Sequence, residues 1–325
     1  KALEELKDSC AMAISEAKAA FGDGRIYLEK YLARARHVEF QILCDSHGNA
    51  IHLLERECSI QRRHQKIIEE TPSTALSPEL RKRMGKAAVD AARASGYVNA
   101  GTVEFMLEPD ENFYFLEVNT RLQVEHPITE MITGVDLVRY QLEIAAGQPL
   151  TLTQDDIAGR GHAIECRIYA EDPQNQFFPS PGKIHFLQEP AGPGVRNDCG
   201  VYSGFEVPVE YDPILSKLVV YAENRDMAIQ RMQRALQDYA ILGVKTPIGF
   251  LIDVLASNAF QTGETFTDFI DMHFAEWSPS QTDVDLAIAA FMAHDQIPAS
   301  TSPLSSAART TGPASVWQTL GNWRL

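Results

Sequence analysis

The sequence predicts an α+β protein, in which helices and hairpins are mixed without strict β-α-β units. Segments whose apolar residues recur at helical spacing are interspersed with segments in which apolar and polar residues alternate. Short turns containing Gly, Pro or Asn join several of the alternating segments. The chain has 325 residues, of which 45% are hydrophobic, so it can form two cores.

Two helices are predicted in the first hundred residues. Residues 1–20 carry an apolar face, and Gly22 ends that helix. Ser77-Pro78-Glu79 is a typical helix start, and Gly96 provides the stop. The strand-like segments and their turns are, in order, 25–32, 36–45, the turn 46–49, 50–57, 101–108, the turn 109–112 and 113–119.

The second half begins with a predicted helix at 134–148, which ends near Gly147. Short strands with Gly/Pro turns follow, and then a long helix at 225–242. The segment 278–325 is rich in Ser, Thr, Pro and Ala, which predicts a linker with one peripheral helix at 283–294.

Charge and cysteine content narrow the possible partners. The formal charge is −15, from 29 basic and 44 acidic residues, which argues against nucleic acid or an anionic membrane as partner. The longest apolar run, 286–293, is far shorter than the ~20 residues that a membrane span needs. Five cysteines without CxxC spacing fit a reducing compartment. The chain starts at Lys1, inside helical periodicity, so we expect it to be cut from a longer protein.

The segment 115–127, FLEVNTRLQVEHP, alternates strictly between apolar or small and polar residues. If it is extended, five polar side chains share one face: Glu117, Asn119, Arg121, Gln123 and Glu125. Two acids, two amides and an arginine are an unusual set for a surface strand, which normally carries interchangeable Lys, Thr, Ser and Glu.

The hairpin around 109–112 brings two acids together. If Glu108 pairs with Phe113, then Glu104 faces Glu117. Two carboxylates ~4 Å apart repel by about 4 kcal/mol at an effective dielectric of ~20, so they splay into solvent, one of them is protonated, or a cation lies between them. With Asn119 they form a set of hard oxygen ligands suited to Mg²⁺ or Mn²⁺. A solvated hairpin face explains the pattern equally well, and a slip of one residue in register would separate the two acids.

A basic cluster, QRRHQK at 61–66, stands out in this acidic chain. It is either a solvated loop or a site for phosphate or a small carboxylate-like anion. Neither G-x-x-x-x-G-K-[ST] nor G-x-G-x-x-G accompanies it. Taken alone, His37 and His126 are interpreted as structural histidines, and Arg167 as a strand arginine paired with an acid.

Several motifs in order closely resemble the biotin carboxylase component of biotin-dependent carboxylases, within the ATP-grasp superfamily. They are RHVEFQIL, ERECSIQRRHQKIIEETPS, GTVEFML, FLEVNTRLQVEHPITEMITGVDLVRYQLEIAAGQPL, GHAIECRIYAEDP and FPSPGKI. The resemblance runs from about Arg25 to about Thr262, and NTRLQVEHPITE is its most specific part. The final SVWQTLGNWRL is similar to the segment that leads out of this domain in acyl-CoA carboxylase α subunits.

The resemblance implies a fold made of the C-terminal half of an ATP-grasp fold followed by the biotin carboxylase C-terminal subdomain. The implied boundaries are 1–158 for the partial ATP-grasp domain, 159–275 for the C-terminal domain and 276–325 for a linker and exit segment. The family's glycine-rich lid and N-terminal domain would lie before Lys1, and no AMKM-like biotin-carrier motif occurs. We therefore expect the longer protein to be active and this polypeptide alone to be inactive.

The resemblance also implies a reaction, in which ATP phosphorylates bicarbonate and the CO₂ released is captured by biotin. It implies the following site residues: Glu29, Lys30, Leu32, His37, Gln61 and His64 for ATP; Glu104, Glu117 and Asn119 for Mg²⁺ or Mn²⁺; Lys66, Arg121, Gln123, the Val124 backbone and Glu125 for bicarbonate, with Glu125 as general base; and Arg167 for the biotin enolate. The implied partners are a biotinyl carrier domain and a carboxyltransferase, in a homodimer or larger assembly. The implied compartment is the cytoplasm, or the mitochondrial matrix in a eukaryote.

Two alternatives remain. A carbamoyl-phosphate synthetase-like enzyme also uses ATP and bicarbonate with an acidic metal strip, although RRHQK, ECRIYAED and SPGKI favour biotin carboxylase. A non-catalytic dimerisation or assembly fragment is the second, against which the full set of polar residues argues. The acyl acceptor, whether acetyl-, propionyl-, methylcrotonyl- or geranyl-CoA, is left open.

Overall fold

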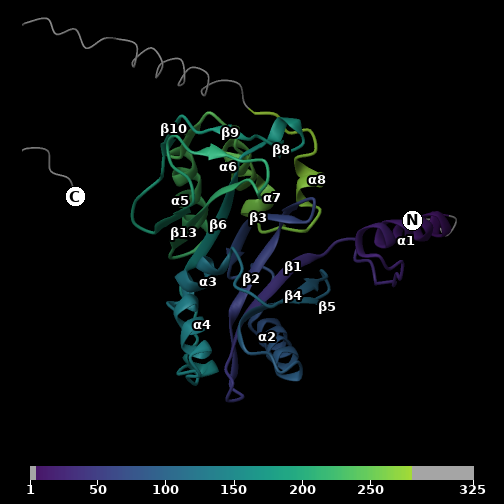
Figure 1. Cartoon of the computed structure of the whole chain (residues 1–325). Coiled ribbons are helices and arrows are strands. Elements are labelled where there is room, and N and C mark those ends of the chain that lie inside the picture. The colour runs from purple at the N-terminus through teal and green to yellow at the C-terminus, as the bar shows by residue number, and fades with distance from the viewer. Residues whose placement is uncertain (1–4, 280–325) are drawn as a thin grey trace, which may run out of the picture. The chain divides into compact units, whose positions relative to one another are not determined.

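The computed structural model describes residues 5–279, and its centre is a single eight-stranded sheet (Figure 1). All its pairings are antiparallel. In spatial order the strands are β11 (Val195–Cys199), β13 (Ile214–Ala222), β6 (His162–Tyr169), β3 (Gln65–Thr71), β2 (Ala50–Arg62), β1 (Arg36–Cys44), β4 (Asn99–Leu107) and β5 (Phe113–Asn119). The pairing of β3 with β6 joins segments that are about a hundred residues apart in sequence.

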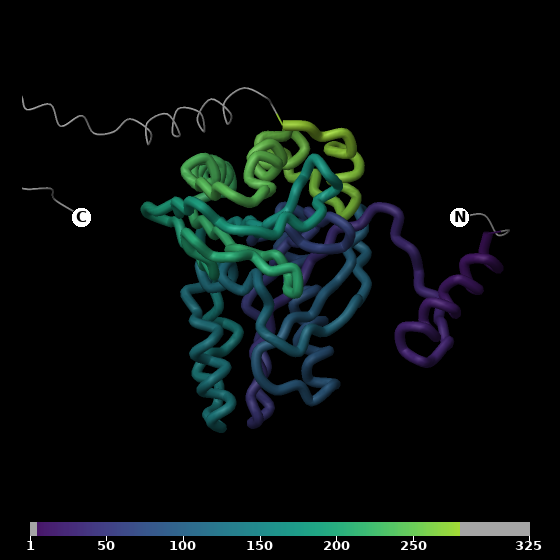
Figure 2. The backbone as a smooth tube through the Cα atoms, turned by 45° about the horizontal axis from the view of Figure 1, so that its top comes forward, coloured from purple at the N-terminus to yellow at the C-terminus, as the bar shows by residue number. Residues whose placement is uncertain are grey.

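One face of the sheet is covered by two groups of helices. Val38, Phe40 and Ile42 of β1 pack with α2 (Pro78–Ala94), because alternate residues of a strand share a face. Ile164 and Ile168 of β6 belong to a second core, which includes residues of α5 (Arg225–Gln237) and α6 (Ile248–Ala256). Figure 2 shows the green and yellow helices of this second group gathered at one end of the sheet.

The other residues of the same strands face a more polar region. Here α3 (His126–Thr133) packs Ile128 and Ile132 against Ala163 of β6 and Val219 of β13. Farther along, α4 (Leu137–Ala145) covers an apolar cluster with β1, β2 and β4. Between these clusters, the side chains that β1 and β4 place on this face are polar, and they form part of a charged site.

The remaining elements lie outside the eight-stranded sheet and the helices described above. They are α1 (Leu6–Phe21), η2 (Gln154–Asp156), β7 (Glu171–Asp172), η3 (Pro173–Asn175), β8 (Phe178–Pro179), β9 (Gly182–Lys183), β10 (Phe186–Gln188), β12 (Glu206–Val207), β14 (Ala240–Leu242), α7 (Asn258–Gln261) and α8 (Phe269–His273). Three two-stranded sheets pair β10 with β14, β12 with β9, and β7 with β8.

The β4–β5 hairpin has the predicted central pairing but a different turn. Glu104 lies opposite Glu117, as predicted, whereas Phe113 pairs with Leu107 and not with Glu108. The register shifts between Glu104 and Phe105, and this β-bulge adds one residue on β5. The longer turn and the bulge offset one another, so the two acids still face each other.

The predicted end of the first helix and the predicted start of the second are confirmed. The Oγ of Ser77 accepts a hydrogen bond from the N–H of Leu80 (3.2 Å) and caps α2. Gly22 ends α1 in the left-handed conformation, with φ 73°, which glycine adopts without a Cβ clash. None of the residues of α1 is buried.

Other predictions of local structure are wrong. Residues 25–32 form no strand. β5 ends at Asn119, as the predicted strand 113–119 does, so the condition that 115–127 is extended throughout is not met. The predicted helix at 225–242 ends at Gln237, because Ala240–Leu242 pairs as β14 with β10. The helix predicted at 134–148 begins only after Asp136, whose side chain caps α4.

The predicted peripheral helix at 283–294 lies outside the described residues. No helix in the range 5–279 has the length and apolar character required to cross a bilayer. All five cysteines are free thiols.

Candidate active site

Lys66 of β3 is the centre of a charged cluster on the polar face of the sheet. Its Nζ lies 2.5 Å from Oε2 of Glu39, 2.9 Å from Oε1 of Glu104 and 2.7 Å from Oε1 of Glu125. The three N–H groups of one ammonium can therefore each donate to a different carboxylate. Burial alone would lower the pKa of Lys66, but the charges of Glu39, Glu125 and Glu104 reverse this effect and raise it well above its usual range. Lys66 is thus held as a cation.

Glu125 immediately precedes α3 and lies between two cations. Its Oε1 accepts from Lys66, and its Oε2 accepts from Nη2 of Arg167 at 2.9 Å. The side chain is buried, and burial together with the charge of Glu39 would raise its pKa. The charges of Lys66 and Arg167 outweigh both effects, so the pKa of Glu125 is lowered. A carboxylate kept ionised in this position can accept a proton from a bound acid.

Arg56 of β2, which is fully buried, organises the floor of this cluster. Its guanidinium uses all five N–H donors, since it donates to Glu39 (2.6 Å), Gln41 (2.8 Å), Thr129 (3.0 Å), Thr102 (3.1 Å) and Gln123 (3.0 Å). These partners come from β1, α3, β4 and the segment before α3, so one side chain fixes four parts of the chain relative to each other.

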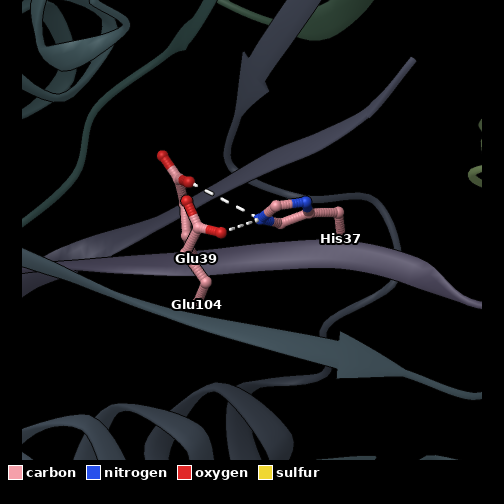
Figure 3. A group of neighbouring side chains, drawn as sticks. All are labelled: His37, Glu39 and Glu104. Atoms are coloured by element: carbon pink, nitrogen blue, oxygen red, sulfur yellow. Dashed lines mark ion pairs between the residues drawn. The ribbon is translucent and has the colours of Figure 1, made fainter. Parts of the chain in front are cut away.

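His37 extends the cluster along β1. Its Nε2 lies 3.1 Å from Oε2 of Glu104 and 3.8 Å from Oε2 of Glu39 (Figure 3). Its Nδ1 lies 2.9 Å from Nε2 of Gln61, so when the amide donates there, the ring carries its proton on Nε2, toward Glu104. One ligand atom each from His37, Glu39 and Glu104 lie within 4.8 Å of one another.

The three predicted metal ligands also meet on the β4–β5 hairpin. The side-chain amide of Asn119 lies 3.0 Å from Oε1 of Glu104 and 3.2 Å from Oε1 of Glu117. Glu104 is buried and Glu117 is exposed, and Nδ2 of Asn119 donates to both carboxylates. Carboxylate and amide oxygens are the ligands that Mg²⁺ prefers, so this donor set fits the predicted ion. To ligate a metal, Asn119 would have to present its oxygen, which requires rotation of the amide.

The remaining residues of the predicted polar strip diverge, because the strand ends at Asn119. Gln123 is buried and donates to Oε1 of Glu104 at 2.9 Å. Arg121 is exposed, and its guanidinium donates to the carbonyl of Leu122 at 3.4 Å. The carbonyl of Val124 accepts from Nζ of Lys217 of β13 at 2.8 Å. The structure thus joins Gln123 and Glu125 to Lys66 and Glu104, but it leaves Arg121 outside the buried cluster.

The basic side chains of the predicted cluster at 61–66 point to different places, because the turn of the β2–β3 hairpin lies within this segment. Arg63 and His64 form the turn between β2 and β3, both with positive φ (49° and 64°), and His64 is exposed. Arg62 pairs with Glu171, and Arg63 donates to the carbonyl of Gln176 at 2.9 Å. Of its basic residues, Lys66 is the one that points into the buried cluster.

The predicted adenine contacts lie in the irregular segment before β1. Lys30 donates to Glu108 (3.2 Å) and to the hydroxyl of Tyr114 (2.5 Å), which ties this segment to the β4–β5 hairpin. Glu29 is exposed, and Leu32 is half-buried. The structure places these residues beside the hairpin and does not join them to the Lys66 cluster.

Four residues of the buried cluster were missed by sequence reasoning: Glu39, Arg56, Glu69 and Glu165. The available signal was the alternation within RHVEFQIL, which puts His37, Glu39 and Gln41 on one face of a strand. Arg56 could not be assigned in this way, because its partners come from distant segments.

Comparison with known families and structures gives a consistent result. Residues 1–153 match the family described as carbamoyl-phosphate synthase L chain, ATP binding domain, and residues 165–272 match the biotin carboxylase C-terminal domain. Biotin carboxylase 2 of Bacillus subtilis is 53% identical over 253 residues, which are 78% of this chain and 57% of that protein. The alpha chain of mitochondrial methylcrotonoyl-CoA carboxylase from Dictyostelium discoideum is 46% identical over 328 residues, 99% of this chain and 46% of that protein.

Among solved structures, the biotin carboxylase domain dimer of Hydrogenobacter thermophilus 2-oxoglutarate carboxylase, in complex with MgADP, ADP and bicarbonate, has a TM-score of 0.81 and 47% identity. The match covers 83% of this chain and 60% of that one. The chain thus spans about half the length of the curated relatives named above.

Proposed function

Because the chain belongs to the biotin carboxylase family, with an ATP-grasp segment and a biotin carboxylase C-terminal domain, we propose that the protein carboxylates biotin with ATP and bicarbonate. Catalysis would begin when bicarbonate loses a proton and attacks the terminal phosphoryl group of ATP. The resulting carboxyphosphate would release CO₂ beside biotin.

The observation that carries this proposal is the position of Glu125 between two cations. Bicarbonate is a weak nucleophile until it is deprotonated, so a base must touch its hydroxyl. A carboxylate base would repel that anion unless positive charges lay beside it. Lys66 and Arg167 lie 2.7 Å and 2.9 Å from the two oxygens of Glu125 and supply such charges.

The other predicted site residues are assigned around this base. Gln123, the Val124 backbone and Arg121 would hold bicarbonate together with Lys66, with Arg121 turning inward from its exposed position. Arg167 would stabilise the negative charge on the biotin ureido oxygen. Glu29, Lys30, Leu32, His37, Gln61 and His64 would contact ATP, and the proximity of His37 to Gln61 supports that pair.

Glu104, Glu117 and Asn119 would hold Mg²⁺ or Mn²⁺, which neutralises charge on the transferred phosphoryl group when bound. The contribution of the chain itself is to keep these side chains fixed. The bulged hairpin sets Glu104 opposite Glu117, while Lys66, Gln123 and Asn119 all donate to Oε1 of Glu104.

The test is ATP cleavage with biotin or ammonia as the second substrate. We expect biotin to raise the rate of ADP formation in the presence of bicarbonate. Stimulation by ammonia or glutamine with no response to biotin would instead support the carbamoyl-phosphate synthetase-like alternative. Matching of residues 165–272 to the biotin carboxylase C-terminal domain favours biotin.

We further propose that the protein is the α chain of an acyl-CoA carboxylase. The alignment with the alpha chain of methylcrotonoyl-CoA carboxylase includes nearly the whole chain, whereas the one with biotin carboxylase 2 covers 78% of it. Its partners would be a biotinyl carrier domain and a carboxyltransferase, in a homodimer or larger assembly. The domain boundaries at 158/159 and 275/276 and a location in the cytoplasm or mitochondrial matrix are part of this proposal.

A further inference from the structure

Two glutamates oppose each other in the middle of the sheet, next to the proposed active site. Glu69 of β3 and Glu165 of β6 are direct partners in the antiparallel pairing of these strands. Both side chains are 0% exposed. Directly opposed like charges destabilise a sheet, and the destabilisation grows where water is excluded.

The two carboxyl groups have few partners. Oε1 of Glu69 accepts from Nε of Arg167 at 2.6 Å and lies 2.5 Å from its Nη2. Within residues 5–279, Oε2 of Glu69 and both oxygens of Glu165 have no hydrogen-bond partner. A buried carboxylate without donors is strongly unfavourable, whereas a protonated carboxyl can donate a hydrogen bond itself.

The cations nearby do not supply the missing charge. Arg167 is shared between Glu69 and Glu125, and Nζ of Lys217 is directed to the carbonyl of Val124 (2.8 Å) and to Asp198 (3.5 Å). The residue opposite Glu165 on β13 is the apolar Val219.

Two more groups come from the neighbouring elements. On α3, Nδ1 of His126 faces the carbonyl of Gln123 at 2.8 Å. Lys66, on the same strand as Glu69, already donates hydrogen bonds to Glu39, Glu104 and Glu125. Acidic groups around Arg167 therefore outnumber the cations available to pair with them.

We propose that Glu165 is a protonated carboxylic acid in the resting protein and that, with Glu69, it forms a carboxyl pair that positions Arg167 beside Glu125. The positioning role rests on the proposed function, whereas the protonation of Glu165 does not. With Glu165 neutral, Glu69 is the one acid of the pair that carries charge, and it holds Arg167 through two N–H groups of the same guanidinium.

The electrostatics of the pair agree with this assignment. Burial, followed by the charge of Glu69, raises the pKa of Glu165 well above its usual range, although Lys217 and Arg167 oppose the shift. Burial also raises the pKa of Glu69, to about 7, with Arg167 as the main opposing charge. Glu69 then changes charge near neutral pH, and its hold on Arg167 strengthens as pH rises through that value.

Infrared spectroscopy of the full-length protein tests the protonation of Glu165 without any substrate. We expect a band from an un-ionised carboxylic acid at a pH well above 7, where Glu69 is ionised, lost in Glu165→Gln and retained in Glu55→Gln. Glu55 is a suitable control because it is equally buried and both its oxygens accept from Arg81. A spectrum of the wild type that lacks this band, or one unchanged by Glu165→Gln, would overturn the proposal.

The positioning role is tested by the pH dependence of the KM for free biotin in the same protein. Glu69→Gln removes the titrating partner of Arg167. Above neutral pH we therefore expect the KM of this variant for biotin to be about tenfold higher than that of the wild type. The change of the KM with pH near 7, which we expect in the wild type, should be absent from the variant. A Glu69→Gln variant that keeps the wild-type pH dependence would contradict the role. If the wild type has no biotin-dependent activity, the proposed function fails, while the infrared result still decides the protonation of Glu165.

Discussion

Nζ of Lys66 lies 2.7 Å from Oε1 of Glu125, although the two residues are separated by 59 positions in sequence. Lys66 is placed by the β2–β3 hairpin, and Glu125 by the turn between β5 and α3. In the proposed reaction this contact would join an anion-binding cation to the base, which is the arrangement that deprotonation of bicarbonate requires.

Replacing Glu125 with glutamine should abolish the base while preserving its shape. We expect biotin-dependent ATP cleavage to fall by about 10²–10⁴-fold, because glutamine cannot accept the bicarbonate proton. Steady-state assays with saturating ATP and bicarbonate measure the effect. Glu79→Gln, at an exposed position in the first turn of α2, is the control. Wild-type rates in Glu125→Gln would exclude Glu125 as the base.

Arg56→Lys should destabilise the fold, because lysine offers three donors where Arg56 makes five hydrogen bonds. The variant would leave Glu39 and several amide and hydroxyl groups incompletely paired in the interior. We expect a loss of about 3 kcal/mol in the free energy of unfolding, measured by urea denaturation. Arg160→Lys, at an exposed position, should change little. Equal stability of the two variants would show that the network around Arg56 is not required.

Glu117 and Asn119, the proposed metal ligands on β5, should control the affinity of the protein for Mg·ATP. Glu117→Gln and Asn119→Ala each remove an oxygen ligand or its positioning, and we expect binding to weaken by about tenfold or more. Calorimetric titration of the full-length protein with Mg·ATP measures the change. Glu111→Gln lies in the turn of the same hairpin and serves as the control. An unchanged affinity in both ligand variants would place the metal elsewhere, with His37 and Glu39 as the next donor set.

Stability should fall in acid because of Glu70. It accepts from His162 (2.8 Å) and from Arg225 (2.7 Å). Burial alone would raise its pKa, but these two partners lower it to about 2 from an ordinary value of 4.5. A carboxyl with a lowered pKa stabilises the fold above its unfolded-state pKa, and this stabilisation is lost as pH falls from 4.5 towards 2.

Thermal unfolding over this pH range tests the contribution of Glu70. Glu70→Gln should be less stable at neutral pH by about 3 kcal/mol and should lose less of its stability on acidification. Glu143→Gln removes a surface pair with Arg139 and should cost at most about 1 kcal/mol. Parallel pH profiles for wild type and Glu70→Gln would refute this account of acid sensitivity.

Local sequence rules predicted much of the fold. The caps at Ser77 and Gly22 and the opposition of Glu104 and Glu117 follow from short-range patterns and are confirmed. The β-bulge was not predictable, because it depends on how β5 packs rather than on any turn residue. The strand predicted at 113–119 is confirmed, but the condition that 115–127 is extended throughout is not met, because the chain turns after Asn119 and begins α3 at His126.

The candidate site could be predicted only in part, because some of its residues meet only through contacts between distant segments of the chain. Lys66, Glu104, Gln123 and Glu125 were named from motifs, and the structure brings them together. The buried acids Glu69 and Glu165 appear only when β3 and β6 pair, a long-range contact that no local pattern contains.

In the proposed reaction, ATP phosphorylates bicarbonate within this site. Bicarbonate labelled with heavy oxygen tests it most directly, because carboxyphosphate would leave one bicarbonate oxygen on the released phosphate. In the presence of biotin we expect one labelled oxygen in each phosphate formed. Phosphate that draws its new oxygen from water would contradict this reaction.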